Sequence, residues 1–287
     1  MKKTIALLLF TTSAALAQKP ADVTIQQVID RRSNGSFAEL SITLQLPKVM
    51  SSQVAASRVL VKTAVDDTGQ SLINAELQEP ELDANMRGTM SRSSEDSPIQ
   101  VSMTLKNPSR KAKKVGDVRG EIELFMPSKD PNSLAEVPKF LSFSGKTLNH
   151  KALKANGVEI TLVSAAQVAA EKKRIGDAKR KEFKEAGYED GENLEQMVQS
   201  TLDYALSFEP SDVPVRIKDP NKRIQQIAYV DAAGEVKQVM LRDAGEGLQK
   251  LATWGDAPQP DWRLRVSLKT PKNLVRYPFA LKDVVLP

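Results

Sequence analysis

The sequence predicts a mainly β protein in which two antiparallel β-sandwich modules are joined by a helical segment. Short stretches of alternating apolar and polar residues recur in the first and last parts of the chain, and Pro, Gly and Asn punctuate them. This pattern is typical of strands with one buried and one wet face. The intervening segment changes to helical periodicity, and a phrase that occurs twice indicates that the two β modules are related.

The repeated phrase spans residues 58–69 and again residues 223–234, and both copies contain Val-Asp-x-x-Gly, centred on Asp66 and Asp231. A second phrase, at residues 104–108, is echoed at residues 267–271. From these repeats and the change of pattern we expect four parts along the chain. They are a signal peptide at 1–17, an N-terminal β-sandwich at 18–164, a helical connector at 165–207 and a smaller C-terminal β-sandwich at 208–287.

The strand prediction rests on a period of two. In residues 39–46 every even position is Leu or Ile and every odd position is polar, and Pro47 is expected to end the strand. Further strands are expected at 59–65, 100–105, 121–125, 158–163, 215–217, 224–230, 236–241, 264–268 and 278–286, and residues 86–98 are expected to form a loop. The pattern is similar, in a general way, to that of exported proteins with immunoglobulin-like sandwiches.

The helical segment opens with a capping signal. Ser164 is followed three residues later by Gln167, and Gly187 suits the position after the end of the helix. A second helix is expected at 192–206. The first helix has a basic face that can contact a partner in the envelope or outside the cell, or can simply be a solvated face that covers a sheet. The candidate partner-binding residues are Lys172, Lys173, Arg174, Lys179, Arg180 and Lys181.

The N-terminus has the three parts of a cleaved bacterial secretory signal. Lys2 and Lys3 precede an apolar run at 5–10, and Ala-Leu-Ala at 15–17 is a cleavage site. We therefore expect a periplasmic or secreted protein with no transmembrane segment in the mature chain. The chain has no Cys, which excludes a lipoprotein anchor, disulfides, thiolate metal sites and a Cys nucleophile.

Composition excludes further classes of function. The 287 residues include 41 Lys and Arg against 36 Asp and Glu, a mild excess that does not predict a nucleic-acid partner. His150 is the single histidine, so histidine-rich zinc chemistry is excluded and a catalytic triad has one possible base. We expect no metal site and no cofactor.

Three groups of carboxylates are candidates for catalysis or metal binding. Residues 67–69 read Asp-Thr-Gly as in aspartic proteases, but the second copy reads Ala-Ala-Gly, which favours a hairpin turn. Glu121 and Glu123 lie two apart on one strand face, which suits a glycosidase pair but also the solvent side of an amphipathic strand. The acidic run at 189–193 suits a turn before the second helix better than a calcium loop. No catalytic residue is therefore predicted.

The two tryptophans, Trp254 and Trp262, flank a proline-rich loop. Their ring faces can stack on sugars, or both can fill the core of the small second module. The leading expectation is a non-enzymatic interaction or structural module of the bacterial envelope or extracellular space. A glycan-binding module that uses Trp254 and Trp262 is the alternative, and a hydrolase that uses surface carboxylates is the second alternative.

Overall fold

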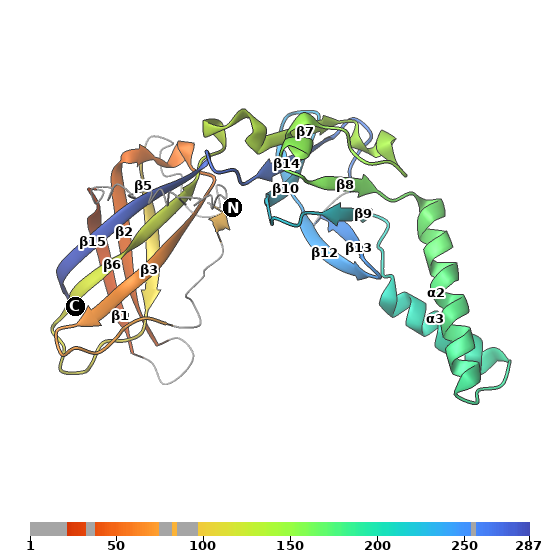
Figure 1. The fold of residues 1–287 in the computed structure, drawn as a ribbon, viewed down its shortest axis with the longest axis horizontal. Helices are drawn as coiled ribbons and strands as arrows, with labels where there is room; N and C mark the ends of the chain where they lie inside the picture. The colour runs from red at the N-terminus through yellow and green to blue at the C-terminus, as the bar shows by residue number, and fades with distance from the viewer. Residues whose placement is uncertain (1–21, 33–37, 75–81, 85–96, 254–256) are drawn as a thin grey trace, which may run out of the picture. The chain divides into compact units, whose positions relative to one another are not determined.

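The computed structural model describes residues 22–32, 38–74, 82–84, 97–253 and 257–287 (Figure 1). It is 45% strand and 22% helix, with four antiparallel sheets and a central helical segment, so the predicted mainly β class is confirmed. Three features of the sequence lie outside the described residues: the predicted signal peptide at 1–17, most of the loop at 86–98, and Trp254.

The chain divides into two compact units that do not coincide with the boundaries expected at 164/165 and 207/208. Unit 1 comprises the chain up to Ser52, Ser57–Glu123 and Arg276–Pro287, and unit 2 comprises Gln53–Ala56 and Leu124–Val275. Unit 2 is thus inserted before the last strand of unit 1. The sequence pattern identified this last strand but assigned it to the second module, because alternation reveals a buried face and not the sheet that a strand joins.

Unit 1 contains a three-stranded and a four-stranded sheet. The first has the order β1 (Thr24–Arg31), β2 (Glu39–Met50) and β5 (Pro98–Leu105), and a short 3-10 helix, η1 (Ser51–Gln53), follows β2. The second has the order β15 (Leu274–Val285), β6 (Lys114–Phe125), β3 (Ala56–Asp66) and β4 (Asp83–Ala84).

The alternation in β2 is seen directly in its burial. Leu40, Ile42 and Leu44 are fully buried, whereas the residues between them are half-buried. In the register of the sheet, Ile42 lies opposite Val28 of β1 and Met103 of β5. The predicted period of two therefore places one face of this sheet in the core of unit 1. The strand does not end at Pro47 but continues to Met50, because an irregularity in its pairing with β5 between Leu46 and Met50 accommodates the proline.

Unit 2 contains two four-stranded sheets. One has the order β11 (Val236–Gln238), β10 (Ile224–Val230), β14 (Arg263–Leu268) and β7 (Leu134–Pro138). The other has the order β12 (Met240–Gly245), β13 (Leu248–Ala252), β9 (Val213–Lys218) and β8 (Glu159–Leu162). The core cluster includes Tyr229, which stacks on Phe140 with ring centroids 5.1 Å apart.

The three α-helices that the structure describes in unit 2 lie between β7 and β9 in the chain. After the 3-10 turns η3 (Pro127–Lys129), η4 (Pro131–Ser133) and η5 (Phe140–Phe143) come α1 (Lys151–Ala155), α2 (Ala165–Glu185) and α3 (Glu192–Ala205). The predicted capping box of Ser164 and Gln167 is present at the start of α2. At its end, the Tyr188 N–H donates to the Phe183 carbonyl (3.1 Å), which is the bond expected of a Schellman motif.

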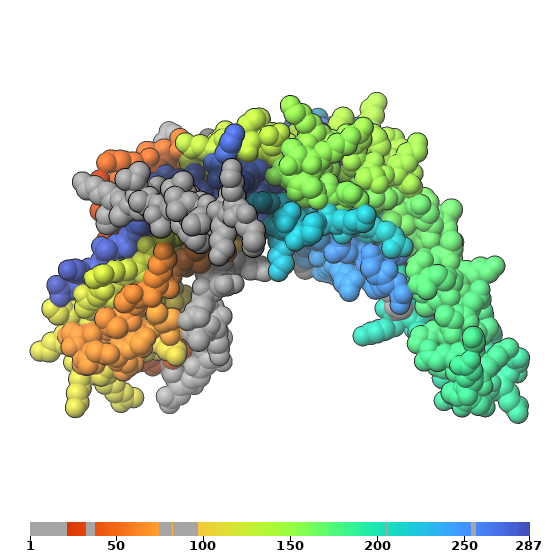
Figure 2. All heavy atoms as spheres, in the orientation of Figure 1, coloured from red at the N-terminus to blue at the C-terminus, as the bar shows by residue number. Residues whose placement is uncertain are grey.

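Helices α2 and α3 run side by side and extend away from the sheets of unit 2 (Figure 1 and Figure 2). Arg180 of α2 bridges to Glu195 of α3 at 2.7 Å. A Cβ added at Gly176 would lie 3.4 Å from Leu202, which shows how closely α3 approaches α2 at this point.

The sequence missed α1, β7 and β13, and the strand expected at 236–241 is two strands, β11 and β12, which belong to different sheets. The repeated phrase marks equivalent hairpins, since Val65 bridges to Ser71 after β3 and Val230 pairs with Val236 after β10. The second echo falls on strands with different neighbours: β5 pairs with β2, whereas β14 pairs with β10 and β7.

Candidate functional site

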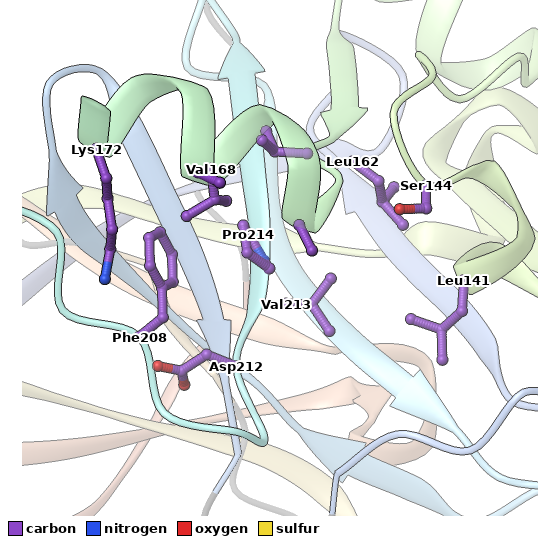
Figure 3. A pocket seen from close by; sticks show the side chains of 12 residues that line it. Leu141, Ser144, Leu162, Val168, Lys172, Phe208, Asp212, Val213 and Pro214 are labelled. Atoms are coloured by element: carbon purple, nitrogen blue, oxygen red, sulfur yellow. The ribbon is translucent and has the colours of Figure 1, made fainter. Parts of the chain in front are cut away.

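A hollow of about 480 Å³ lies in unit 2, where the first two turns of α2 cover the ends of β8 and β9 (Figure 3). We call it the α2 pocket. Its lining is mostly apolar and comes from η5, the end of β8, the first half of α2, the 207–212 loop and the start of β9. The lining residues are Leu141, Ser144, Leu162, Val163, Ala165, Val168, Ala169, Lys172, Phe208, Asp212, Val213 and Pro214.

Helix α2 presents one face to this pocket. Ala165, Val168, Ala169 and Lys172 recur at the spacing i, i+3, i+4, i+7, which aligns side chains along one side of an α-helix. The capping box at Ser164 fixes where that face begins. The floor is fixed by a strand contact, because the Val163 N–H donates to the Pro214 carbonyl at 2.9 Å.

A buried ion pair holds the loop beside the pocket. The side chain of Asp212 is 2% exposed, and its Oδ2 lies 2.8 Å from Nζ of Lys250 on β13. The same oxygen accepts the Glu209 N–H at 2.8 Å, and Lys250 also donates to the Ser207 carbonyl at 2.9 Å. These bonds tie the 207–212 loop to the sheet at both of its ends. Removing either partner would leave an uncompensated charge in a buried position.

The charge of Asp212 also reaches the core. Burial raises the pKa of Tyr229, and the negative charge of Asp212 raises it further. Tyr229 therefore stays a neutral phenol, with its hydroxyl 3.5 Å from the Leu251 carbonyl. Tyr229 therefore adds no charge to the buried core cluster of unit 2.

The polar atoms of the α2 pocket are gathered at one end. Figure 3 shows Lys172 and Asp212 on either side of Phe208, with Leu141 and Ser144 at the far end. Asp212 is compensated by Lys250, whereas within the part of the chain that the structure describes no carboxylate lies within 4.0 Å of Nζ of Lys172. The pocket thus combines an apolar length with a cationic end, a composition that is typical of ligand sites.

The six basic residues predicted to bind a partner do not form one uncompensated patch. Lys172 lines the α2 pocket and Lys173 is exposed. The other four pair with acids of unit 2. These pairs are Arg174 with Glu171 and Glu246, Lys179 with Glu182, Arg180 with Asp177 and Glu195, and Lys181 with Glu185. Recognition of an envelope protein by this helix stays a prediction.

Of the two tryptophans, the structure describes Trp262. Its ring is half-buried, packs against the core cluster of unit 2, and lies 6.2 Å from the ring of Tyr229. Glycan recognition by Trp254 and Trp262 stays a prediction, because Trp254 lies outside the described residues.

The carboxylates considered for catalysis hold structural bonds. Asp67 accepts the Lys113 N–H at 3.2 Å, and Glu121 pairs with Lys62. In the acidic run at 189–193, Asp190 pairs with Lys184 at 2.7 Å and Gly191 is the N-cap of α3, as a turn before the helix requires.

The predicted environment of Glu123 was wrong. The alternation of its strand places this residue on the solvent side, but its side chain is fully buried. It lies between Arg58 of β3, at 2.7 Å, and Arg276 of β15, at 2.9 Å. Arginines from the two neighbouring strands cover a carboxylate that the alternation of β6 alone places on the wet face.

Neither a cluster of metal-ligating side chains nor a membrane-spanning helix occurs in the residues that the structure describes. No group of three or more His, Cys, Asp or Glu side chains there could hold a metal ion. No helix in the same residues is long and apolar enough to cross a membrane.

Most of the α2 pocket was not found from the sequence. The helical spacing of Ala165, Val168 and Lys172 was a usable signal for one wall. The sequence contained no signal for the pairing of Asp212 with Lys250, since these residues are distant in the chain and meet only through the sheet.

Comparisons of the chain with protein-family models, with curated proteins and with solved structures found no match.

Proposed function

We propose that this chain is a non-enzymatic binding protein of the bacterial envelope or extracellular space, which reaches its compartment through a cleaved signal peptide. Its ligand has an apolar body and binds in the α2 pocket. The observation that carries this proposal is the pocket itself: an apolar hollow of about 480 Å³ beside a fully compensated Asp212–Lys250 pair. Pockets of about 300–1,000 Å³ bury most of the surface of a small ligand.

Three buried carboxylates favour a binding role over catalysis, because each is already held by hydrogen bonds or ion pairs within the protein. Asp66 accepts three backbone N–H groups, Glu123 is held by two arginines, and Asp212 is held by Lys250. A general acid or base needs access to the proton that it transfers. Carboxylates that are saturated by permanent donors are poorly suited to that work.

We further propose that unit 1 has immunoglobulin-like topology. Its sheet orders β1-β2-β5 and β15-β6-β3-β4 correspond to the orders A-B-E and G-F-C-C′ of that fold. Unit 2 then sits in the chain between strands F and G. Long insertions at such loops are compatible with the fold because the closure entropy rises slowly with loop length.

We propose the same topology for unit 2 with one substitution of strands. The order β8-β9-β13-β12 corresponds to A-B-E-D, and β11-β10-β14 corresponds to C′-C-F. Strand β7, which precedes the others in the chain, takes the place of strand G beside β14. The helices α2 and α3 are then an insertion between strands A and B, and they supply one wall of the α2 pocket.

The binding function is tested with Nile red, a neutral dye whose fluorescence rises in apolar surroundings. We expect residues 18–287 to bind it at one saturable site. The variant Val168→Trp, which fills the α2 pocket, should abolish this binding, and the matched variant Ala170→Trp, on an exposed position of α2, should leave it unchanged. Equal binding by both variants and the parent protein would show that the pocket is not the site.

Export is tested by expressing the full chain in bacteria and determining the N-terminus of the product in each fraction. We expect a protein that begins at Gln18 in the periplasm or the medium. An uncleaved protein confined to the cytoplasm would contradict the proposed compartment.

A further inference from the structure

We infer that the ligand of the α2 pocket is a single-chain aliphatic carboxylate, with its carboxylate at Lys172 and its chain running past Val168 and Val213 toward Leu141. This inference rests on the proposed binding function and names its ligand class. Three features of the pocket favour this ligand: the position of its charges, the pairing of the acids around Lys172, and its apolar length.

The charges favour an anion at one end only. Lys172 and Asp212 both lie at the Phe208 end of the pocket (Figure 3). Asp212 is paired with Lys250 at 2.8 Å. Lys172 is therefore the charge at this end of the pocket that no acid of the described residues compensates. An anionic headgroup supplies the opposite charge, and a neutral or cationic headgroup does not.

The neighbouring acids do not take this role. Glu171, beside Lys172 on α2, is held by Arg174 at 2.7 Å, and in the residues that the structure describes no acid lies within 4.0 Å of the Lys172 ammonium. Lys172 is half-buried, and its stem lies beside Phe208 in the apolar lining (Figure 3). Next to an apolar lining, where the effective dielectric constant is lower than in bulk water, an ammonium attracts a carboxylate more strongly.

The group is a monoanion rather than a phosphate. A doubly charged headgroup would face the nearby Asp212 carboxylate with only one lysine to compensate it. Phosphate sites use several arginines or free backbone N–H groups at a helix N-terminus. At the start of α2 the Gln167 N–H is already bonded to Ser164 Oγ, at 3.2 Å. A single flexible lysine matches a single carboxylate.

The body of the ligand is an extended aliphatic chain. Away from Lys172 the lining is Val168, Val213, Leu162 and Leu141, with the Ser144 side chain at the far end. Such a surface offers dispersion contacts along its length and few hydrogen-bonding groups, so a sugar or a polar peptide would lose its bonds to water there.

The test is isothermal titration calorimetry of residues 18–287 with octanoate, decanoate, dodecanoate and tetradecanoate below their micelle concentrations. Affinity should rise about fourfold for each added methylene, as burial of a methylene predicts, until the pocket is full. Dodecanol, which has the same chain and no charge, should bind about tenfold more weakly than dodecanoate. Salt should weaken the binding of dodecanoate and leave that of dodecanol unchanged.

Three variants locate the contacts. Lys172→Met keeps an unbranched stem and removes the charge, and it should weaken dodecanoate about tenfold without affecting dodecanol. Lys173→Met, a change of the same kind at the exposed neighbouring position, should have no effect. Val168→Trp should abolish the binding of both ligands. Circular dichroism and thermal unfolding of each variant check that it is folded.

The outcomes separate this inference from the function on which it rests. Equal affinity for dodecanol and dodecanoate, with no effect of Lys172→Met, would overturn the carboxylate inference and leave an apolar binding site. Binding of dodecanoate that survives Val168→Trp would also overturn it, because the ligand would then lie elsewhere. Absence of binding by both ligands and by Nile red would overturn the inference and the proposed function together.

Discussion

The two units of this protein contain the same hairpin turn in different surroundings. In unit 1 the Asp66 N–H donates to the Gln70 carbonyl, and in unit 2 the Asp231 N–H donates to the Glu235 carbonyl, both at 3.0 Å. The aspartate side chain accepts the N–H four residues later in both turns, at 2.9 and 2.8 Å. The glycines that follow have φ values of 87° and 86°. The shared local sequence therefore forms the same turn in both units.

The surroundings of the two aspartates differ. Asp66 is 3% exposed, and its second oxygen accepts the Ser109 N–H at 2.9 Å from the loop after β5. Asp231 is half-buried and has Lys237 at 3.5 Å. The same short motif thus links two distant segments in unit 1, through the bond from Ser109, and forms a local turn in unit 2. Burial and long-range donors, rather than the motif, decide how much a residue stabilises its unit.

A second pair of clusters shows the same contrast. Glu123 of unit 1 is fully buried between Arg58 and Arg276. Glu136 of unit 2 also lies between two arginines, Arg263 at 3.3 Å and Arg265 at 2.6 Å, but its side chain is 29% exposed. These matched pairs allow the effect of burial to be measured with the chemistry held constant.

The largest effect is expected for Glu123→Ala. This change removes a buried carboxylate together with its ion pairs to Arg58 and Arg276, so it should lower the free energy of unfolding of unit 1 by about 3 kcal/mol. The matched change Glu136→Ala should lower that of unit 2 by about 1 kcal/mol, because its cluster is screened by water. Urea unfolding gives the values, and hydrogen exchange read by mass spectrometry assigns them to the units. Equal losses of unfolding free energy in the two units would show that burial does not change the contribution of the carboxylate.

Asp66→Ala ranks next. The change leaves the backbone N–H groups of Thr68, Gln70 and Ser109 without their acceptor, and it should destabilise unit 1 by about 2 kcal/mol. Asp231→Ala should have a smaller effect in unit 2, since water reaches the groups it leaves behind. Both variants are compared by urea unfolding. An effect of Asp231→Ala as large as that of Asp66→Ala would show that the turn alone carries the energy.

The contribution of Asp66 should also depend on pH. Burial acts to raise the pKa of Asp66, but the hydrogen bonds from Ser109, Thr68 and Gln70 outweigh it and hold the pKa below its ordinary value. The folded protein then binds this proton less readily than the unfolded chain. The stabilisation is present above the unfolded pKa of about 3.9 and is lost as the pH falls through the lower folded pKa.

Asp66→Asn, which does not titrate, measures this dependence. The difference in unfolding free energy between the parent protein and Asp66→Asn should be constant near neutral pH and shrink below about pH 4. Urea unfolding at a series of pH values gives the difference directly. A difference that grew as the pH fell would mean that the sign of the pKa shift is reversed.

The smallest effect is also the one that should be equal in the two units. Gly69→Ala and Gly234→Ala each force a side chain into a left-handed conformation, at a cost of about 1 kcal/mol. Apart from the neighbouring residues in the chain, a Cβ at either position would have no heavy atom within 4 Å, so no tertiary clash adds to the backbone strain. Thermal unfolding of the two variants checks this. Unequal costs would show that the turns differ locally as well as in their surroundings.

Much of the secondary structure was predictable because it is local. The alternation of residues 39–46 identified β2, the Ser164–Gln167 capping box located the start of α2, and Val-Asp-x-x-Gly located both hairpins. The candidate site was predictable only in the helical spacing of its α2 wall. Phe208 and the Asp212–Lys250 pair gave no signal, because they meet through a loop and a strand that are distant in the chain.

By itself the sequence determined the mainly β class, the positions of most strands and the two turns, since each depends on the period of side chains or on bonds within a few residues. The tertiary structure decided that β15 joins β6 and not unit 2, that Glu123 is buried, and that α2 covers a pocket beside Asp212. The physical reason is that an alternating strand specifies which face it buries but not which neighbour it pairs with. Burial and ion pairing are therefore fixed only when distant segments meet.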